Sequence, residues 1–563
     1  MFSDFGLGAD AGSESPFGAL AVDRASTIRS IDKIGHADVV VIGGGIHGAT
    51  FARIAALNGL KTVLLERADY ASGTSSRSSK MAHGGLRYLE MLDFAQVYEG
   101  IKAREDLFVT APHLVKPQEF LLPVYADSPP RWKLGFGLWL YDQMSRVPGR
   151  RQSWISARQL GPNHFSAGHS GFRGAFRYFD GLMRDTRIVI ENIIAARQEG
   201  ALCLNYAAVN SISSLNFGKV ELGWTDTLTQ TSHEITTGIV VNCAGPWVAQ
   251  VGRITPSELA SSIRFSQGSH LLFDKKWEGP ALFLPLAEKN RYYWVWPHPA
   301  GTLVGTTERE VSALPDDPQP TANEIEEILA RLERDVPHSG LSRSNLHYAF
   351  AGIRTLPLRK ASAGSVAQLS RRHIWAYGSG TLHLLGGKFT TASWTALEGL
   401  RQVFKLAHLS HEPVSLKGRL LPGAALYAES VERFDREAQA AGVSESLRAG
   451  AIARMGALVR FLLADKSFLE PLGGRLLRGE VEFARHVEQA ETLEDIMRRR
   501  VELEYAPDHG LSAVGEISRL LSVQLGAAKA SEQEQRYRER LATLSQLLQG
   551  RGASLQSEES AVG

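Results

Sequence analysis

A glycine-rich segment near the N-terminus limits the fold more than any other feature. From Asp38 the chain reads DVVVIGGGIHGATFARIAALNGLKTVLLERAD. Residues 39–42 are apolar and β-branched, which predicts a buried parallel strand. A helical stretch follows, and Asn58-Gly59 predicts its C-terminal end. A second apolar strand, residues 62–65, ends at Glu66. This order predicts the strand–helix–strand unit that opens a doubly wound α/β domain.

The glycines of this segment have the spacing of a dinucleotide site. Gly43, Gly45 and Gly48 form G-x-G-x-x-G. The first allows a tight turn, the second allows the backbone to approach a pyrophosphate, and the third allows close helix–strand packing. The helix N-terminus offers N–H groups to the phosphates. Glu66, 18 residues beyond Gly48, is placed to accept hydrogen bonds from a ribose. A tight βαβ turn without a ligand is the alternative.

The stretch that follows favours FAD over a nicotinamide cofactor. ASGTSSRSSKMAHGGLRYLEMLDF carries a run of hydroxyls, then Lys80, His83 and Gly84-Gly85. The hydroxyls could bind a pyrophosphate or ribityl chain, and the double glycine lets backbone lie against a flat ring. A flexible polar linker is the alternative, but an amphipathic helix is expected to start near Leu86. The hydroxyl-rich loop consists of Thr74, Ser75, Ser76, Ser78 and Ser79.

Two later segments repeat the pattern of an apolar strand that ends in glycine. Residues 239–247 read IVVNCAGPW and contain Gly245, and residues 382–391 read LHLLGGKFTT and contain Gly387 and Lys388. Thr390 or Thr391 is expected to cap the helix that follows. The positive end of that helix could stabilise negative charge on a reduced flavin. Gly387-Lys388 is not a P-loop, because the earlier glycine is missing.

These motifs together resemble the FAD-dependent glycerol-3-phosphate dehydrogenases. The matching pieces occur in the family's order and cover about residues 36–545. The resemblance implies a doubly wound, Rossmann-like FAD-binding domain, an antiparallel-sheet substrate domain and a C-terminal helical domain. The pieces are DVVVIGGGIHGA, GTSSRSSKMAHGGLRYLE, APHLVKPQEFLLPVY, VNCAGPWV, GSHLLF, GTTE, AGIRTLPL, LLGGKFTT and LRGEVEFARHVEQAETLEDIMRRR.

The chain divides accordingly into four expected regions. Residues 1–35 are rich in Gly, Ala and Ser and are expected to be a flexible tail. The FAD domain is expected at 36–115, 176–260 and 346–410, the substrate domain at 116–175 and 261–345, and the helical domain at 418–548. Within the substrate domain, RYYWVWPHPAGTLVGTTE predicts two strands joined at 297–301.

The resemblance also implies roles for individual residues. His83 would lie near the flavin N5, and His270 near the substrate pocket. Arg87 with Tyr88, Arg354 and Lys388 would hold a substrate phosphate. Predicted cofactor contacts are Gly43, Gly45, Gly48, Glu66, Thr74, Ser75, Ser76, Lys80, His83, Gly84, Gly245, Gly387, Lys388 and Thr390.

Three positions depart from the family's usual pattern. His47 stands where asparagine is frequent, Arg184 where aspartate is common, and Ala392-Ser393 where Tyr-Arg commonly follows GGKFTT. These departures leave the exact substrate open. An oxidase of another small substrate, such as an amino acid, and a flavoprotein without turnover are the alternatives.

The expected chemistry explains why these residue types are needed. Oxidising the C2 alcohol of sn-glycerol 3-phosphate to dihydroxyacetone phosphate moves a hydride to flavin N5 and releases a proton. A histidine suits the proton transfer, and His83 is the first candidate and His270 the second. Arg87 and Arg354 supply the bidentate fork that a phosphate dianion favours. The predicted catalytic set is therefore His83, Arg87, Arg354 and His270.

The electron acceptor is a separate question. The family passes electrons to a membrane quinone, whereas related oxidases use oxygen. WKLGFGLWLYDQMSRVPGRRQSW, from Trp132, could meet a bilayer, or it could be an amphipathic helix packed on the substrate domain. Arg498–Arg500 could attract lipid headgroups, although Glu494 and Asp495 can pair with them along a helix. We expect a cytoplasmic protein, with peripheral attachment to the inner face of the cytoplasmic membrane and a homodimer both left open.

Composition excludes several other classes. The formal net charge of +2 gives no reason to expect a nucleic-acid partner. The two cysteines, Cys203 and Cys243, exclude a disulfide framework and show no zinc spacing, so no metal is expected. The first 35 residues lack the pattern of a secretory signal. No apolar run approaches the roughly 18 residues that cross a bilayer.

Overall fold

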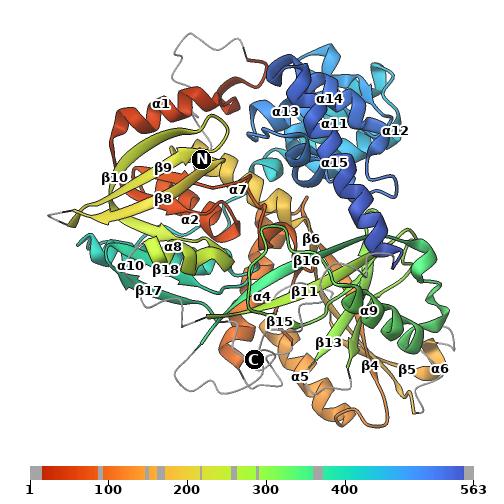
Figure 1. Ribbon diagram of the computed structural model, residues 1–563. Helices are drawn as coiled ribbons and strands as arrows, with labels where there is room; N and C mark the ends of the chain where they lie inside the picture. Colours follow the sequence, from red (N-terminus) through yellow and green to blue (C-terminus); the bar gives the residue numbers. More distant parts are fainter. Residues whose placement is uncertain are drawn as a thin grey trace, which may run out of the picture.

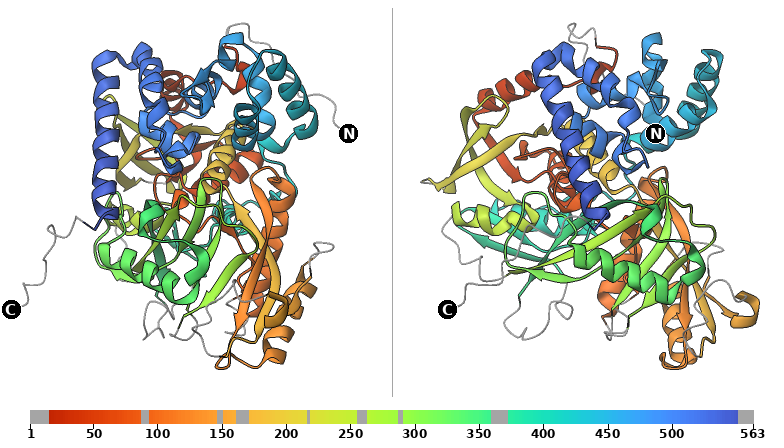
Figure 2. Two further views of the ribbon diagram at one scale, coloured as in Figure 1. Left: turned by 90° about the vertical axis from the view of Figure 1, so that its right-hand side faces the viewer. Right: turned by 45° about the vertical axis from the view of Figure 1, so that its right-hand side comes forward.

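The computed structural model describes residues 15–86, 93–145, 151–160, 171–215, 218–254, 263–286, 291–358 and 372–550. These residues form two large β-sheets with helices around them and a helical region near the C-terminus (Figures 1 and 2). This mixed architecture confirms the predicted fold class.

The first sheet carries the glycine-rich segment. Its strands follow the order β17-β18-β10-β1-β2-β7, and every pair from β18 to β7 is parallel. The hairpin β8–β9 extends it from β10. The strands are β1 (His36–Ile42), β2 (Thr62–Leu65), β7 (Leu202–Leu204), β8 (Ala207–Ser214), β9 (Val220–Asp226), β10 (Thr231–Asn242), β17 (Ile374–Gly378) and β18 (Thr381–Leu385).

Strand β1 is buried on both faces, as its continuous apolar run predicts. Val39 and Val41 belong to the larger core, which includes residues of α2 (Ile46–Leu57), α7 (Asp185–Gln198) and α10 (Ala392–Leu406). Val40 and Ile42 point to the other side, into a core built with β8, β9 and β10. Because side chains alternate along a strand, β1 joins two cores and holds the loop that follows it firmly.

The second sheet has the order β15-β11-β14-β13-β12-β4-β6-β3, with β16 paired to β11 and β5 to β6. Its pairs are antiparallel except β12–β4, which is parallel. The predicted strand pair on either side of residues 297–301 is confirmed as β13–β14. The strands are β3 (Met81–Ala82), β4 (Val115–Val124), β5 (Ser153–Ser156), β6 (Gly174–Met183), β11 (Ile263–Phe273), β12 (Ala281–Pro285), β13 (Tyr292–His298), β14 (Gly301–Gly305), β15 (Arg309–Val311) and β16 (Leu346–Pro357).

One expected domain boundary falls inside β6, and another falls at the start of β16. We assigned 176–260 and 346–410 to the FAD domain, but β6 pairs with β4 and β16 pairs with β11. Both strands are apolar and lead from one sheet toward the other. Hydrophobicity alone does not indicate which sheet such a strand joins, because a buried strand looks the same in either.

The helical region packs against both sheets. Its helices are α11 (Tyr427–Ala440), α12 (Glu445–Met455), α13 (Arg478–His486), α14 (Leu511–Leu525) and α15 (Ala527–Leu548). The end of α15 reaches the second sheet, where Leu544 and Leu548 join its core. Other helices are α4 (Phe94–Thr110), α5 (Arg131–Met144), α6 (Ala157–Leu160), α8 (Val248–Ile254) and α9 (Ala322–Asp335). The helix expected from Leu86 falls mostly on residues outside the described ranges.

The N-terminal segment differs from the expected flexible tail. Phe17 is 1% exposed and stacks on Phe468 in the helical region, with ring centroids 5.4 Å apart. Helix α1 (Arg24–Ile34) follows, capped by Asp23, and its Arg24 pairs with Asp226 on β9. The Gly, Ala and Ser content suggested a loose chain, but one buried aromatic and one ion pair hold residues 17–34 in place.

Among the helices in the described part of the chain, none is both long and apolar enough to cross a membrane.

Candidate active site

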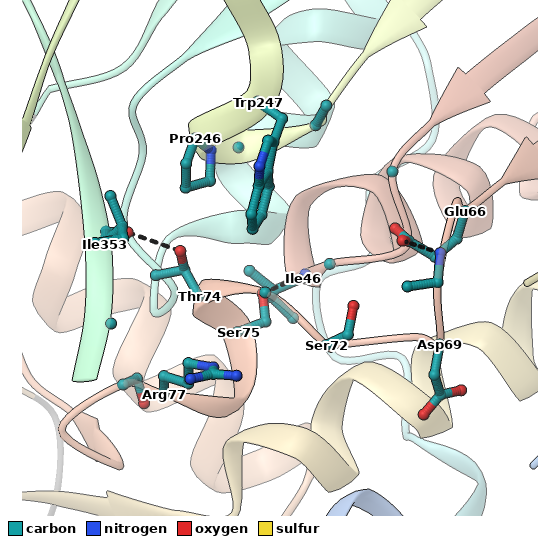
Figure 3. Close-up of a pocket in the computed structure, with 18 of the residues that line it drawn as sticks. Ile46, Glu66, Asp69, Ser72, Thr74, Ser75, Arg77, Pro246, Trp247 and Ile353 are labelled. Atoms are coloured by element: carbon teal, nitrogen blue, oxygen red, sulfur yellow. Dashed lines mark hydrogen bonds between the residues drawn. The ribbon is translucent and has the colours of Figure 1, made fainter. Parts of the chain in front are cut away.

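A cavity of about 970 Å³ lies where the two sheets and the helical region meet. Its wall comes from the glycine-rich loop, the loop after β2, the ends of β10 and β18, strands β11 and β16, and residues 492–537. Figure 3 shows part of this wall, with Ser75 and Ile46 on one side and Trp247 above them.

The glycine-rich loop requires glycine at two positions. Gly43 has φ +105°, and a Cβ there would lie 2.7 Å from the Cys243 carbonyl oxygen. A Cβ on Gly48 would lie 1.8 Å from the Gly43 carbonyl oxygen. Gly43 and Gly45 line the cavity, whereas Gly48 packs behind them. The loop and the N-terminus of α2 therefore fit the backbone cradle that a pyrophosphate needs.

Glu66 lies at the end of β2 on the cavity wall. Its carboxylate accepts hydrogen bonds from the N–H of Gly44 at 2.6 Å and of Ala68 at 2.9 Å. Burial raises the pKa of Glu66, and the two N–H donors oppose that rise. Each carboxylate oxygen has a second lone pair, so these contacts leave room for ribose hydroxyls.

The hydroxyls at the start of the hydroxyl-rich loop form hydrogen bonds with backbone groups of the protein. Thr74 donates to the Ile353 carbonyl at 2.7 Å, and Ser75 accepts from the N–H of Ile46 at 2.9 Å (Figure 3). Both still line the cavity, as do Ser78 and Ser79. The loop thus joins β16 of the second sheet to α2 of the first.

Besides Gly48, three predicted cofactor contacts do not reach the cavity wall. Lys80 directs its ammonium to Asp185 at 2.7 Å, because that buried carboxylate is its counter-charge. Ser76 lies behind the loop, and its carbonyl accepts from Lys80. The N–H of Gly84 donates to Tyr141. The structure therefore does not bring Ser76, Lys80 or Gly84 to the cavity.

The remaining predicted cofactor contacts line the same cavity. His83, Gly245, Gly387, Lys388 and Thr390 all line it. Lys388 donates to Gln96 of α4 at 2.6 Å. Gly387 has φ +114°, which only glycine adopts readily. The expected cap of α10 is wrong in detail: Thr391 is the N-cap residue, but its hydroxyl caps no N–H of the helix.

His270 and Arg354 lie together on the wall formed by the second sheet. Gly268 and His270 are two residues apart on β11 and share a face. The Arg354 guanidinium of the neighbouring strand β16 covers Gly268 and donates to Thr306 at 3.0 Å. His270 stacks on Phe350 with centroids 4.9 Å apart, and Ser79 contacts its Nε2 at 2.9 Å. Burial, then Arg354 and Lys80, hold the pKa of His270 well below its usual value.

The three departures from the family pattern occupy different places. His47 lines the cavity, and burial and then His373 lower its pKa to about 3. Arg184 instead contacts the Ala453 carbonyl at 2.7 Å and Glu502 in the helical region. Ala392 is buried at the start of α10 and is not part of the cavity wall. Of the three, His47 is therefore the one that shapes the cavity.

Arg87 and Tyr88, predicted to bind substrate, lie outside the described residues. The sequence interpretation also missed some wall residues. Arg67 lies 4.5 Å from the ring centroid of Trp247, and both line the cavity. Asp185 supports the wall from behind. Asp185 is more than 100 residues from the loop it contacts, so no local pattern could have indicated it.

Comparison with known proteins decides the family. The family model described as "FAD dependent oxidoreductase" matches residues 38–398, well over half of the chain. The chain belongs to the FAD-dependent oxidoreductase family. FAD is therefore its cofactor, as the glycine-rich loop and the loop after β2 predicted, and the residues of the cavity fit it.

The oxidoreductase has relatives that match it nearly end to end. A glycerol-3-phosphate dehydrogenase from Synechocystis sp. is 32% identical, and the match covers 89% of this chain and 96% of that protein. A D-erythritol 1-phosphate dehydrogenase from Brucella abortus is also 32% identical, over 82% of this chain and 93% of that protein. These relatives confirm the resemblance to the FAD-dependent glycerol-3-phosphate dehydrogenases.

A solved structure shares the fold. The glycerol-3-phosphate dehydrogenase from Bacillus halodurans complexed with FAD superposes with a TM-score of 0.73. It is 23% identical, and the alignment covers 93% of this chain and 97% of that one.

Proposed function

We propose that this oxidoreductase converts sn-glycerol 3-phosphate to dihydroxyacetone phosphate. The observation that carries the proposal is that His270 and Arg354, packed side by side, line the same cavity as the glycine-rich loop that suits FAD. The names of the Synechocystis and Brucella relatives support a short phosphorylated polyol as substrate.

Arg354 and Lys388 bind the substrate phosphate in this proposal. The planar guanidinium of Arg354 offers paired N–H donors, and Lys388 adds a second cation on the same cavity. Arg87 and Tyr88 belong to the same proposed subsite. Holding the phosphate fixes the position of C2 and its hydroxyl, which is how binding energy from a remote group serves the reacting centre.

A histidine removes the hydroxyl proton. Burial and its cationic neighbours lower the pKa of His270, which leaves a nitrogen lone pair available but makes the imidazole a weaker proton acceptor. His83 lines the same cavity and remains the other candidate base. Bound FAD supplies the hydride acceptor at N5.

Electrons then pass to a membrane quinone, and α5 is the proposed contact with the bilayer. Its inner face is packed, because Leu138 and Tyr141 are buried. Its outer face exposes Trp132 at 75%, Phe136 at 59% and Trp139 at 47%. Exposed aromatics on a helix suit a membrane interface. The buried face supports packing of this helix against the protein, and the exposed face supports the proposed contact with the bilayer.

The arginine run does not share that role. Arg499 and Arg500 are buried and pair with Asp69, while Arg498 pairs with Glu494. We propose peripheral attachment to the inner face of the cytoplasmic membrane through α5, and the homodimer stays a prediction.

An anaerobic titration tests the function. The oxidised flavin band should disappear when sn-glycerol 3-phosphate is added without oxygen, and glycerol should have no effect because it lacks the phosphate. Stronger reduction by D-erythritol 1-phosphate would keep the reaction class but replace the substrate. A band that persists with every phosphorylated polyol would contradict the proposal.

A further inference from the structure

The support behind the hydroxyl-rich loop centres on one buried carboxylate. Asp185 is fully buried and stands in the first turn of α7, where the positive end of the helix favours a negative charge. Its Oδ2 accepts from the Ser78 hydroxyl at 2.7 Å and the Ser78 N–H at 3.3 Å. Its Oδ1 accepts from Lys80 Nζ at 2.7 Å. One side chain thus binds the loop at both ends of the turn 78–80.

The turn itself needs this support. Lys80 has φ +52°, a left-handed conformation that costs a residue with a side chain about 1 kcal/mol or more. The Lys80 side chain is 6% exposed, and a buried ammonium requires a partner. Besides Asp185, it contacts the Ser76 carbonyl at 3.0 Å and lies 5.1 Å from the Tyr505 ring. Removing the carboxylate would therefore release the turn.

The residue between the two anchored positions faces the cavity. Ser79 lines the wall, and its hydroxyl contacts Nε2 of His270 at 2.9 Å. Ser78 lines the wall as well, whereas Asp185 and Lys80 do not. The anchors are thus hidden from any ligand, and the residues that they position are exposed to it.

We propose that Asp185 is a positioning residue for the cofactor: through Ser78 and Lys80 it fixes the turn 78–80 against the FAD cavity and holds Ser79 on His270. This role depends on FAD as the cofactor and not on the identity of the substrate. It assigns to the chain a determinant of FAD affinity that does not itself contact FAD.

The test compares D185N with E480Q. Glu480 is also a buried carboxylate, paired with Arg454 through two hydrogen bonds in the helical region, and it is not part of the cavity wall. Apoprotein of each variant is titrated with FAD, and circular dichroism of the bound flavin is recorded. We expect D185N to raise the FAD dissociation constant at least tenfold and to change the flavin dichroism. E480Q should lower the unfolding temperature but leave both FAD readouts unchanged.

K80Q is the second variant, in case D185N does not fold. Lys80 is not on the cavity wall, so K80Q removes no direct contact with FAD and tests the support of the turn. An FAD dissociation constant within twofold of wild type in D185N or K80Q would overturn the proposal. Equal weakening by E480Q would overturn it too, because the effect would then be general destabilisation. A wild-type protein that binds FAD but is not reduced by sn-glycerol 3-phosphate would count against the proposed function and leave this inference standing.

Discussion

At the scale of single residues, Arg354 is the side chain whose role can be tested most directly. R354A should raise the KM for sn-glycerol 3-phosphate roughly 10- to 100-fold, because a charge-assisted hydrogen bond contributes about 1.5–3 kcal/mol. R354K keeps the charge but loses the planar fork, so its KM should lie between those of wild type and R354A. Steady-state kinetics measure both effects.

R264A is the matched control for these variants. Arg264 lies on the neighbouring strand β11 but pairs with Glu310 near the surface, away from the cavity wall. Its KM should equal that of wild type. If R354A left KM unchanged, Arg354 would have no part in phosphate binding.

Residues that act through local spacing were predictable, and those that act through distant contacts were not. Gly43 and Glu66 follow a strand at fixed intervals, so their places on the cavity wall could be read from the sequence. Lys80 looked like a cofactor contact because it follows the hydroxyl-rich loop. Its actual partner, Asp185, is distant in sequence, and only the folded chain shows that the ammonium turns away from the cavity.

At the scale of elements, the N-terminal segment links the helical region to the first sheet. Phe17 packs against Phe468 and Phe483 of the helical region, while α1 follows along the first sheet (Figure 1). F17A should destabilise the protein by about 3–5 kcal/mol, as expected for a fully buried phenylalanine. Chemical denaturation measures the change.

V523A provides the comparison, since Val523 is 87% exposed on α14. Its free energy of unfolding should stay within about 0.5 kcal/mol of wild type. A similarly small change in F17A would show that the N-terminal segment contributes little to the free energy of unfolding.

Helix α5 is the second element with a separable role. A variant carrying W132S, F136S and W139S should lose binding to anionic phospholipid vesicles in a sedimentation assay, because its exposed apolar face is gone. Anaerobic flavin reduction by substrate should stay normal, since none of the three residues lines the cavity. Vesicle binding equal to that of wild type would exclude α5 as the membrane contact.

At the scale of the whole molecule, the types of domain were predicted from the sequence better than the boundaries between them. The strand–helix–strand unit of the parallel sheet follows from local patterns, whereas the antiparallel-sheet domain and the C-terminal helical domain were implied by the family resemblance. The boundaries do not follow from local patterns, because β6 and β16 cross between the regions and their apolar residues would suit either sheet. The cavity forms where these regions meet, so its wall was predictable only in part.

Asp317 joins those regions by charge. It lies between β15 and α9 and pairs with Arg77 of the hydroxyl-rich loop and with Arg498 and Arg540 of the helical region. Burial alone would raise the pKa of Asp317, but the three arginines outweigh it and hold the pKa well below its usual value. Its contribution to stability is therefore complete above the unfolded carboxyl pKa of about 4 and is lost as the pH falls further.

D317N should accordingly destabilise the protein by roughly 1 kcal/mol at pH 7, a modest value because the carboxylate is partly exposed and screened. The difference in unfolding temperature between D317N and wild type should shrink as the pH falls below about 4. D316N is the control, because Asp316 pairs with the exposed Arg67 and should show little difference at any pH. A D317N difference that stayed constant down to acid pH would mean that the residue acts by packing, not by its charge.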